Sequence, residues 1–120
     1  MRNIVKYWLP LYFYAALIFY LSSLSRPLPE TNIINFDKFA HAVEYFIFGF
    51  LAARALKNSS LQLFRQNFKI IAILFAVAYG VSDELHQHFV PMRQFSVFDM
   101  ICDGIGGIMG VLIHGRHPSV

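Results

Sequence analysis

Long apolar runs constrain what this chain can fold into more than any other feature. The first extends from Tyr7 to Ser25 without a charged residue, and three later runs carry most of their polar residues at one end. A helix that rises about 1.5 Å per residue needs roughly 20 mostly apolar residues to cross the core of a bilayer. We therefore predict an all-α integral membrane bundle of four transmembrane helices, over residues 7–25, 37–55, 68–90 and 97–114.

The composition also favours a membrane protein. Of the 120 residues, 57% are hydrophobic and 14% are charged, whereas a soluble domain carries about 25% charged residues. A chain of this length predicts a single domain, residues 1–120. A cleaved signal peptide is the alternative for the first run, because Ser23 and Ser25 form a small-x-small pattern. The length and aromatic content of the run favour a membrane helix.

Lysine and arginine orient the predicted bundle. If the N-terminus is cytoplasmic, most of them lie inside, as the positive-inside rule requires. The inner residues are Arg2, Lys6, Arg54, Lys57, Arg65, Lys69 and Arg116, and the outer ones are Arg26, Lys38 and Arg93. We predict two cytoplasmic termini, a multi-pass protein of the inner (plasma) membrane, and a solvated His114 on the inner tail. Membrane lipids are the expected partners, and anionic inner-leaflet lipid explains the basic rim without nucleic acid.

Polar side chains collect at the opposite, outer end. In this layout all seven acidic residues lie in the outer half of the membrane or just outside it. Intramembrane charges usually face a bundle interior or a water-filled cavity, and i, i+4 spacing places several of them on shared helix faces. We predict one polar chamber at the outer ends of the second, third and fourth helices. Its expected ligand-binding residues are Asp37, Lys38, His41, Glu44, Asp83, Glu84, His86, Gln87, Arg93, Asp99 and Asp103.

Glycines follow these acids along the last run. Gly106 and Gly110 form a GxxxG pattern, with Gly104 and Gly107 beside it. Small residues at this spacing let two membrane helices approach closely. We expect the glycines to serve helix packing.

Two stretches carry a resemblance to a known family. FDKFAHAVEYFIFGF (36–50) and SDELHQHFVPMRQFSVFDMICDGIGG (82–107) resemble the signature blocks of the VanZ-like family. The resemblance extends from Phe36 to about Gly110. It implies a small multi-pass bacterial membrane protein of the cell envelope. The namesake of the family is linked to teicoplanin resistance, and teicoplanin acts outside the membrane on cell-wall precursors.

Three functions are consistent with the predicted chamber. In the first, the chamber binds an envelope ligand, either a lipid-linked precursor or a glycopeptide, and contributes to teicoplanin resistance. In the second, it is an intramembrane enzyme that acts on a lipid phosphate or cell-wall precursor. The candidate acid–base residues are then His41, Glu44, Asp83 and His86, since histidine exchanges protons near neutral pH. In the third, the polar residues form a structural network without a ligand. The absence of an obvious nucleophile favours binding over catalysis.

A metal-assisted version of the enzyme stays open. His41, Glu44, Asp83, His86 and Asp103 offer the nitrogen and oxygen ligands that zinc or a harder divalent cation takes. Their spacing matches no known metal motif, so the sequence requires no cofactor. It also leaves oligomerisation open.

Overall fold

The computed structural model describes residues 4–23, 36–90 and 97–115, and every regular element in these ranges is helical. A π-helical turn, η1 (Ile4–Trp8), leads into α1 (Leu9–Ser23). The other elements are α2 (Phe36–Lys57), α3 (Gln62–Gln66), α4 (Phe68–His88) and α5 (Val97–Gly115). The predicted all-α class is confirmed.

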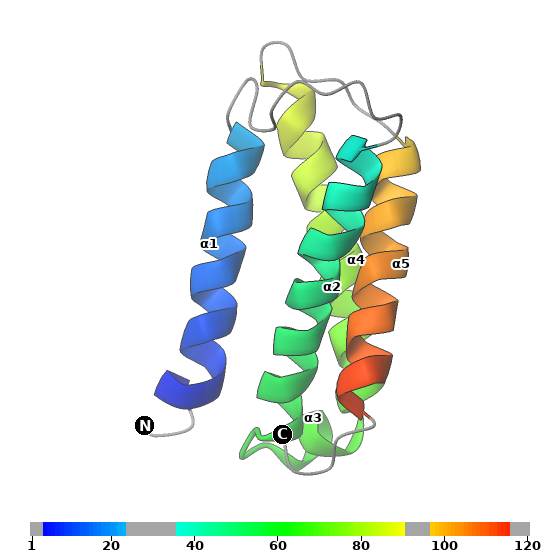
Figure 1. Ribbon diagram of the computed structural model, residues 1–120. Coiled ribbons are helices and arrows are strands. Elements are labelled where there is room, and N and C mark those ends of the chain that lie inside the picture. The colour runs from blue at the N-terminus through cyan, green and yellow to red at the C-terminus, as the bar shows by residue number, and fades with distance from the viewer. Residues whose placement is uncertain (1–3, 24–35, 91–96, 116–120) are drawn as a thin grey trace.

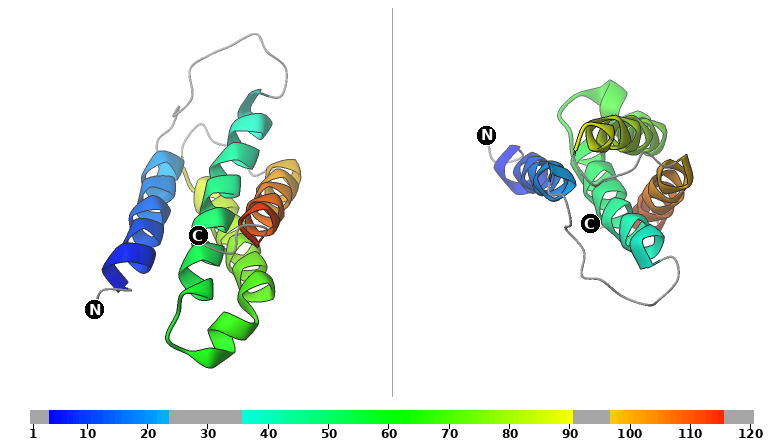
Figure 2. Two further views of the ribbon diagram at one scale, coloured as in Figure 1. Left: turned by 60° about the horizontal axis from the view of Figure 1, so that its bottom comes forward. Right: turned by 90° about the horizontal axis from the view of Figure 1, so that it is seen from above.

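The four long helices lie roughly side by side in one bundle (Figure 1). Helices α1 and α4 run in one direction, and α2 and α5 run in the other. Viewed from above, α2, α4 and α5 form a triangle, and α1 stands beside it (Figure 2). The start of α1, the α2–α4 connection and the end of α5 therefore lie at one end of the bundle.

Helices α2 and α5 are in backbone contact because glycines line their interface. A Cβ added at Gly106 would lie 2.1 Å from the carbonyl oxygen of Ala42, and one at Gly110 would lie 2.0 Å from that of Phe46. On the facing helix, a Cβ at Gly49 would lie 2.2 Å from the carbonyl oxygen of Gly107. No side chain fits at these distances, so the predicted GxxxG pattern does serve close helix packing.

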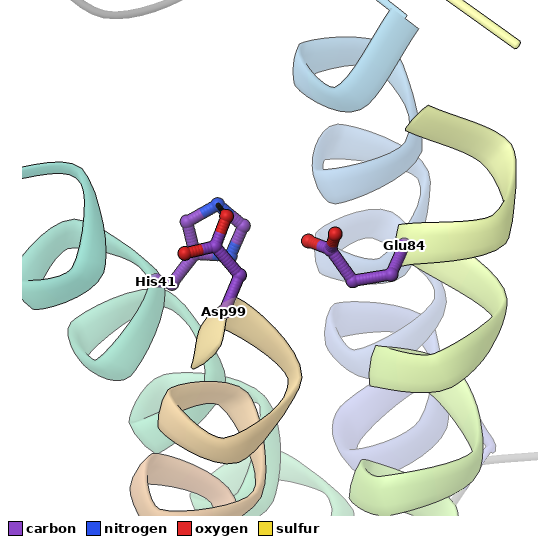
Figure 3. Close-up of side chains that lie close together, drawn as sticks. All are labelled: His41, Glu84 and Asp99. Carbon is purple, nitrogen blue, oxygen red and sulfur yellow. Dashed lines mark ion pairs between the residues drawn. The ribbon is translucent and has the colours of Figure 1, made fainter. Parts of the chain in front are cut away.

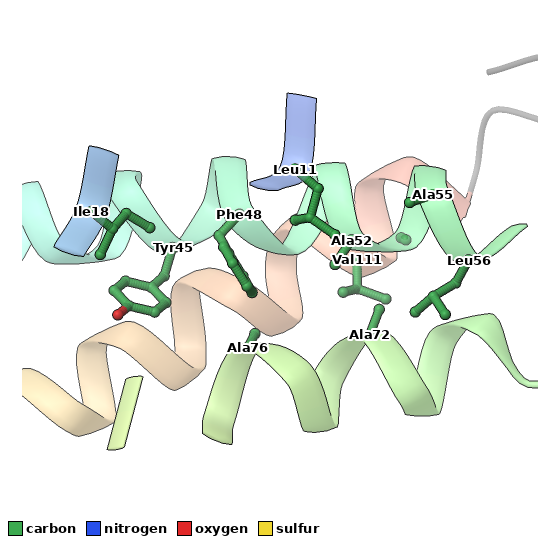
Figure 4. Close-up of a cluster of buried hydrophobic side chains, with 11 residues drawn as sticks. Leu11, Ile18, Tyr45, Phe48, Ala52, Ala55, Leu56, Ala72, Ala76 and Val111 are labelled. Carbon is green, nitrogen blue, oxygen red and sulfur yellow. The ribbon is translucent and has the colours of Figure 1, made fainter. Parts of the chain in front are cut away.

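Small residues dominate the rest of the interior. Around a few large side chains, which include Ile18, Tyr45, Phe48 and Leu56, the core is filled by fully buried alanines (Figure 4). These alanines are Ala52, Ala53, Ala55, Ala72 and Ala76. Alanine costs no side-chain entropy on burial and keeps α2 and α4 close together.

Helix α1 is attached to this triangle by sparser contacts. The Tyr14 hydroxyl donates a hydrogen bond to the carbonyl oxygen of Glu44 over 2.8 Å, and the Tyr79 hydroxyl donates one to the carbonyl oxygen of Ala15. Between these contacts and α3, a groove of about 980 Å³ separates α1 from its neighbours. The groove is mostly apolar, and its walls include Trp8, Tyr12, Phe64 and Phe75.

By length and composition, two stretches of the described helices could cross a membrane, Phe39–Lys57 and Val97–Gly115. Helix α1 has only 15 residues because the preceding turn is π-helical. Helix α4 carries Lys69, Asp83 and Glu84 within its 21 residues. The four-span layout and the orientation of the termini remain predictions.

Candidate functional site

Five ionisable side chains from three helices meet inside the end of the bundle opposite α3. His41 comes from α2, Asp83 and Glu84 from α4, and Asp99 and Asp103 from α5. All five are buried: Glu84 and Asp103 are 0% exposed, and the other three are 6–7% exposed. We call these five residues the polar cluster.

His41 lies at the centre of the polar cluster. Its Nδ1 is 2.8 Å from Oδ1 of Asp103, which is hydrogen-bond distance. Its Nε2 lies 3.9 Å from Oδ2 of Asp99, which is too far for a hydrogen bond. The contact with Asp103 fixes the orientation of the ring, since a carboxylate beside one nitrogen places the proton there and leaves the other nitrogen as an acceptor.

The carboxylates lie in two groups around this ring. One group contains Glu84 and Asp99, which approach His41 from α4 and α5 (Figure 3). The other contains Asp83 and Asp103. In each group, one ligand atom from each carboxylate and one from His41 lie within 4.8 Å of one another. Both groups therefore have the size and the donor types of a cation site.

Local sequence explains how the carboxylates reach the interior. Asp99 and Asp103 are one turn apart, so both project from one face of α5. Asp99 also lies in the first turn of that helix, where the dipole favours a negative charge. On α4, Gly80 leaves room beside Asp103, because a Cβ at Gly80 would lie 3.1 Å from the Asp103 Cβ and 3.4 Å from its Oδ2.

His86 lies apart from both carboxylate groups, against α1. Its ring stacks on Phe19 with 4.4 Å between centroids, and its Nε2 lies 2.9 Å from the Ser23 hydroxyl. Ser23 already donates its only proton to the carbonyl oxygen of Phe19. His86 must therefore be the donor in the Ser23 contact, so this pair is not arranged for activation of the serine as a nucleophile.

The remaining predicted residues divide between described and undescribed parts of the chain. Gln87 is 3% exposed and buried at the same end of α4. Glu44 is half-buried on α2 and belongs to neither carboxylate group. Arg93 lies outside the described residues, and the side chains of Asp37 and Lys38 also lie outside what the structure describes.

One histidine is placed differently from the sequence prediction. His114 was expected on a solvated tail, but it is 0% exposed at the far end of α5. Its ring meets the edges of Phe50, at 4.8 Å between centroids, and Phe68, at 6.5 Å. The prediction was wrong because α5 continues to Gly115, which keeps His114 on the face that packs against α2 and α4. Its i, i+4 spacing from Gly110 on that face was the available signal.

These features define a class of small helical bundle in which three closely packed helices enclose a carboxylate–imidazole cluster. A family model described as VanZ/LLP1 matches residues 2–115, and the chain belongs to this family. The predicted family membership is thus confirmed. Comparisons with curated proteins and with solved structures each gave no match.

Proposed function

We propose that this chain is a multi-pass protein of the inner membrane whose polar cluster binds an envelope ligand from the outer side. The ligand class is the head group of a lipid-linked cell-wall precursor or a glycopeptide. The observation that carries the proposal is the burial of four carboxylates around one imidazole at one end of an otherwise apolar bundle. Such groups are costly at membrane depth and usually belong to a binding or transport site.

The distribution of side-chain size supports a membrane setting. Glycine and alanine fill the contacts between helices, while large apolar side chains point outward along α1, α4 and α5. Among the exposed ones are Phe13 at 75%, Leu74 at 60% and Ile105 at 52%. Water would oppose this arrangement, whereas lipid chains favour it, because association of membrane helices depends on close packing of small residues.

The charge distribution supports the proposed orientation. Arg54 at the end of α2 donates a hydrogen bond to the carbonyl oxygen of Lys6 over 3.1 Å, and its guanidinium lies 4.8 Å from the centre of the Tyr7 ring. Lys57, Arg65 and Lys69 lie at the same end of the bundle, opposite the polar cluster. A cytoplasmic basic end leaves the polar cluster facing the outer leaflet.

One observation favours the enzymatic alternative. The hydrogen bond between His41 and Asp103 orients an imidazole with a buried carboxylate, which is the arrangement of a general base. Catalysis would also need a nucleophile or an activated water beside His41. The serine–histidine contact of Ser23 with His86 has its donor and acceptor reversed for that role.

The orientation is tested with reporter fusions. A reporter placed after Val120 should behave as cytoplasmic, and one inserted between α4 and α5 should behave as external. The reverse readout at both positions would place the polar cluster on the cytoplasmic side and would refute binding from the outer leaflet.

Binding is tested with purified protein in lipid nanodiscs. An undecaprenyl-linked phosphate and teicoplanin should each be assayed against the wild type, Asp83→Asn and the control His88→Gln, which changes an exposed histidine at the same end of α4. We expect at least one probe to bind the wild type and the control but not Asp83→Asn. Equal binding to all three proteins, or binding of neither probe, would contradict the proposal.

A further inference from the structure

We propose that the polar cluster is a binding site for a first-row divalent metal ion, held by His41, Asp83 and Asp103. One ligand atom from each residue lies within 4.8 Å of the others. The three come from three different helices, α2, α4 and α5, so the packed triangle fixes their positions. This inference does not depend on an envelope ligand, and its test uses the metal alone.

Two buried oxygens point to a cation at this position. Within residues 4–23, 36–90 and 97–115, neither Oδ2 of Asp83 nor Oδ2 of Asp103 has a hydrogen-bond partner. Asp83 is 6% exposed and Asp103 is 0% exposed. An acceptor oxygen that is buried without a partner is costly, and a metal ion would satisfy both oxygens at once.

The donor set selects the kind of ion. One imidazole nitrogen and two carboxylate oxygens suit Mn²⁺, Fe²⁺ or Zn²⁺, whereas Mg²⁺ and Ca²⁺ prefer oxygen ligands only. Three protein ligands leave at least one coordination position for water or for an oxygen of a ligand. An ion bound to Nδ1 of His41 would take the place of the proton between Nδ1 and Oδ1 of Asp103, which lie 2.8 Å apart, and the neutral imidazole would then carry its proton on Nε2.

The other carboxylate group supplies an internal alternative. Asp99 lies 3.9 Å from Nε2 of His41, which is the ring nitrogen that does not contact Asp103, and Glu84 belongs to the same group (Figure 3). We assign the ion to the Asp83 side because both carboxylates of that group have a buried oxygen without a hydrogen-bond partner among the described residues, which is not so for the Glu84 side. An ion on the Glu84 side would instead leave the His41–Asp103 hydrogen bond intact.

The first test measures Mn²⁺ binding to the chelator-treated full-length chain in detergent. We expect one Mn²⁺ per chain, displaced by Zn²⁺, with electron spin echo modulation from one imidazole nitrogen. This readout requires no variant to fold. Absence of stoichiometric Mn²⁺ binding, or a bound ion without nitrogen coupling, would overturn the proposal.

Matched variants then locate the ion. Asp83→Asn and His41→Gln should weaken Mn²⁺ binding at least tenfold. Two control variants change an acid on α2 and a histidine on α4 that lie outside the polar cluster. These controls, Glu44→Gln and His86→Gln, should bind Mn²⁺ as the wild type does. Glu84→Gln should retain binding within a few-fold. If Glu84→Gln loses the ion and Asp83→Asn keeps it, the assignment to the Asp83 side is wrong.

Discussion

The interface between α2 and α5 and the interface between α1 and the rest of the bundle are built in different ways. At the first, the helices are so close that a Cβ added to Gly49, Gly106 or Gly110 would lie 2.0–2.2 Å from a carbonyl oxygen of the facing helix. At the second, two tyrosine hydrogen bonds span from helix to helix and a groove of about 980 Å³ remains. The polar cluster lies within the tight part. We infer that backbone contact between helices, rather than side-chain volume, positions the carboxylates.

The comparison predicts that Gly110→Ala has the largest effect. Its Cβ would lie 2.0 Å from the carbonyl oxygen of Phe46 and 2.9 Å from the amide nitrogen of Phe50. Neither backbone atom can move alone, so α5 must shift away from α2, at a cost of about 3 kcal/mol or more. Thermal unfolding in detergent measures the loss.

Gly104→Ala is the control for this experiment. A Cβ at Gly104 would have no neighbour within 4 Å, and alanine favours the helix over glycine by about 1 kcal/mol. This variant should melt at or above the wild-type temperature. If Gly104→Ala and Gly110→Ala lost equal stability, the backbone contact would not be what holds the triangle together.

Substitution of two alanines on α4 compares the tightly packed α2–α4–α5 triangle with the loose interface beside α1. Ala76 is 0% exposed, and its Cβ lies 2.6 Å from where a Cβ of Gly107 would be. Ala78 lines the groove beside α1. We expect Ala76→Leu to destabilise the protein by about 1–3 kcal/mol through overpacking, and Ala78→Leu to change stability by less than about 0.5 kcal/mol. Equal losses in melting temperature would show that the groove is packed as tightly as the triangle.

The smallest effect is expected when one of the hydrogen bonds between α1 and the rest of the bundle is removed. Tyr14→Phe removes the hydroxyl that donates to the carbonyl oxygen of Glu44. Interhelical hydrogen bonds in membrane proteins contribute about 0.6 kcal/mol on average, so a slight drop in melting temperature should follow. The matched variant Tyr12→Phe changes an exposed tyrosine, 60% accessible, and should be neutral. Complete unfolding of Tyr14→Phe would mean that α1 is integral to the bundle.

Much of the fold follows from the sequence because its apolar runs and glycine spacing are local signals. The run over residues 68–90 predicts a helix whose last turns are polar, and α4 has such an end but stops at His88 rather than at residue 90. The spacing of Gly106 and Gly110 alone predicts a close contact between helices. The partner residues, Ala42 and Phe46, are not visible in the sequence, because they depend on how α2 and α5 cross.

The membership of the site was harder to predict. Helical spacing groups His86 with Asp83 and Gln87, yet His86 turns toward Phe19 and Ser23 of α1. Spacing also places Glu44 on the same helix face as His41. In the structure, however, Glu44 is only half-buried, and the next residue, Tyr45, is the one that is fully buried. A residue shift of one position moves a side chain by about 100° around a helix with 3.6 residues per turn. The choice between neighbours therefore depends on tertiary packing, which a single sequence does not show.

The central claim is that the polar cluster is kept for binding at some cost to stability, and the melting temperature of Asp83→Asn in detergent with a chelator tests it most directly. Oδ2 of Asp83 has no hydrogen-bond partner in the described part of the chain, and asparagine keeps the shape while removing the buried charge. We predict that Asp83→Asn melts at or a few degrees above the wild type, as binding-site substitutions often do, while His88→Gln is unchanged. A large fall in the melting temperature of Asp83→Asn alone would show that the cluster holds the helices together, and would contradict the account.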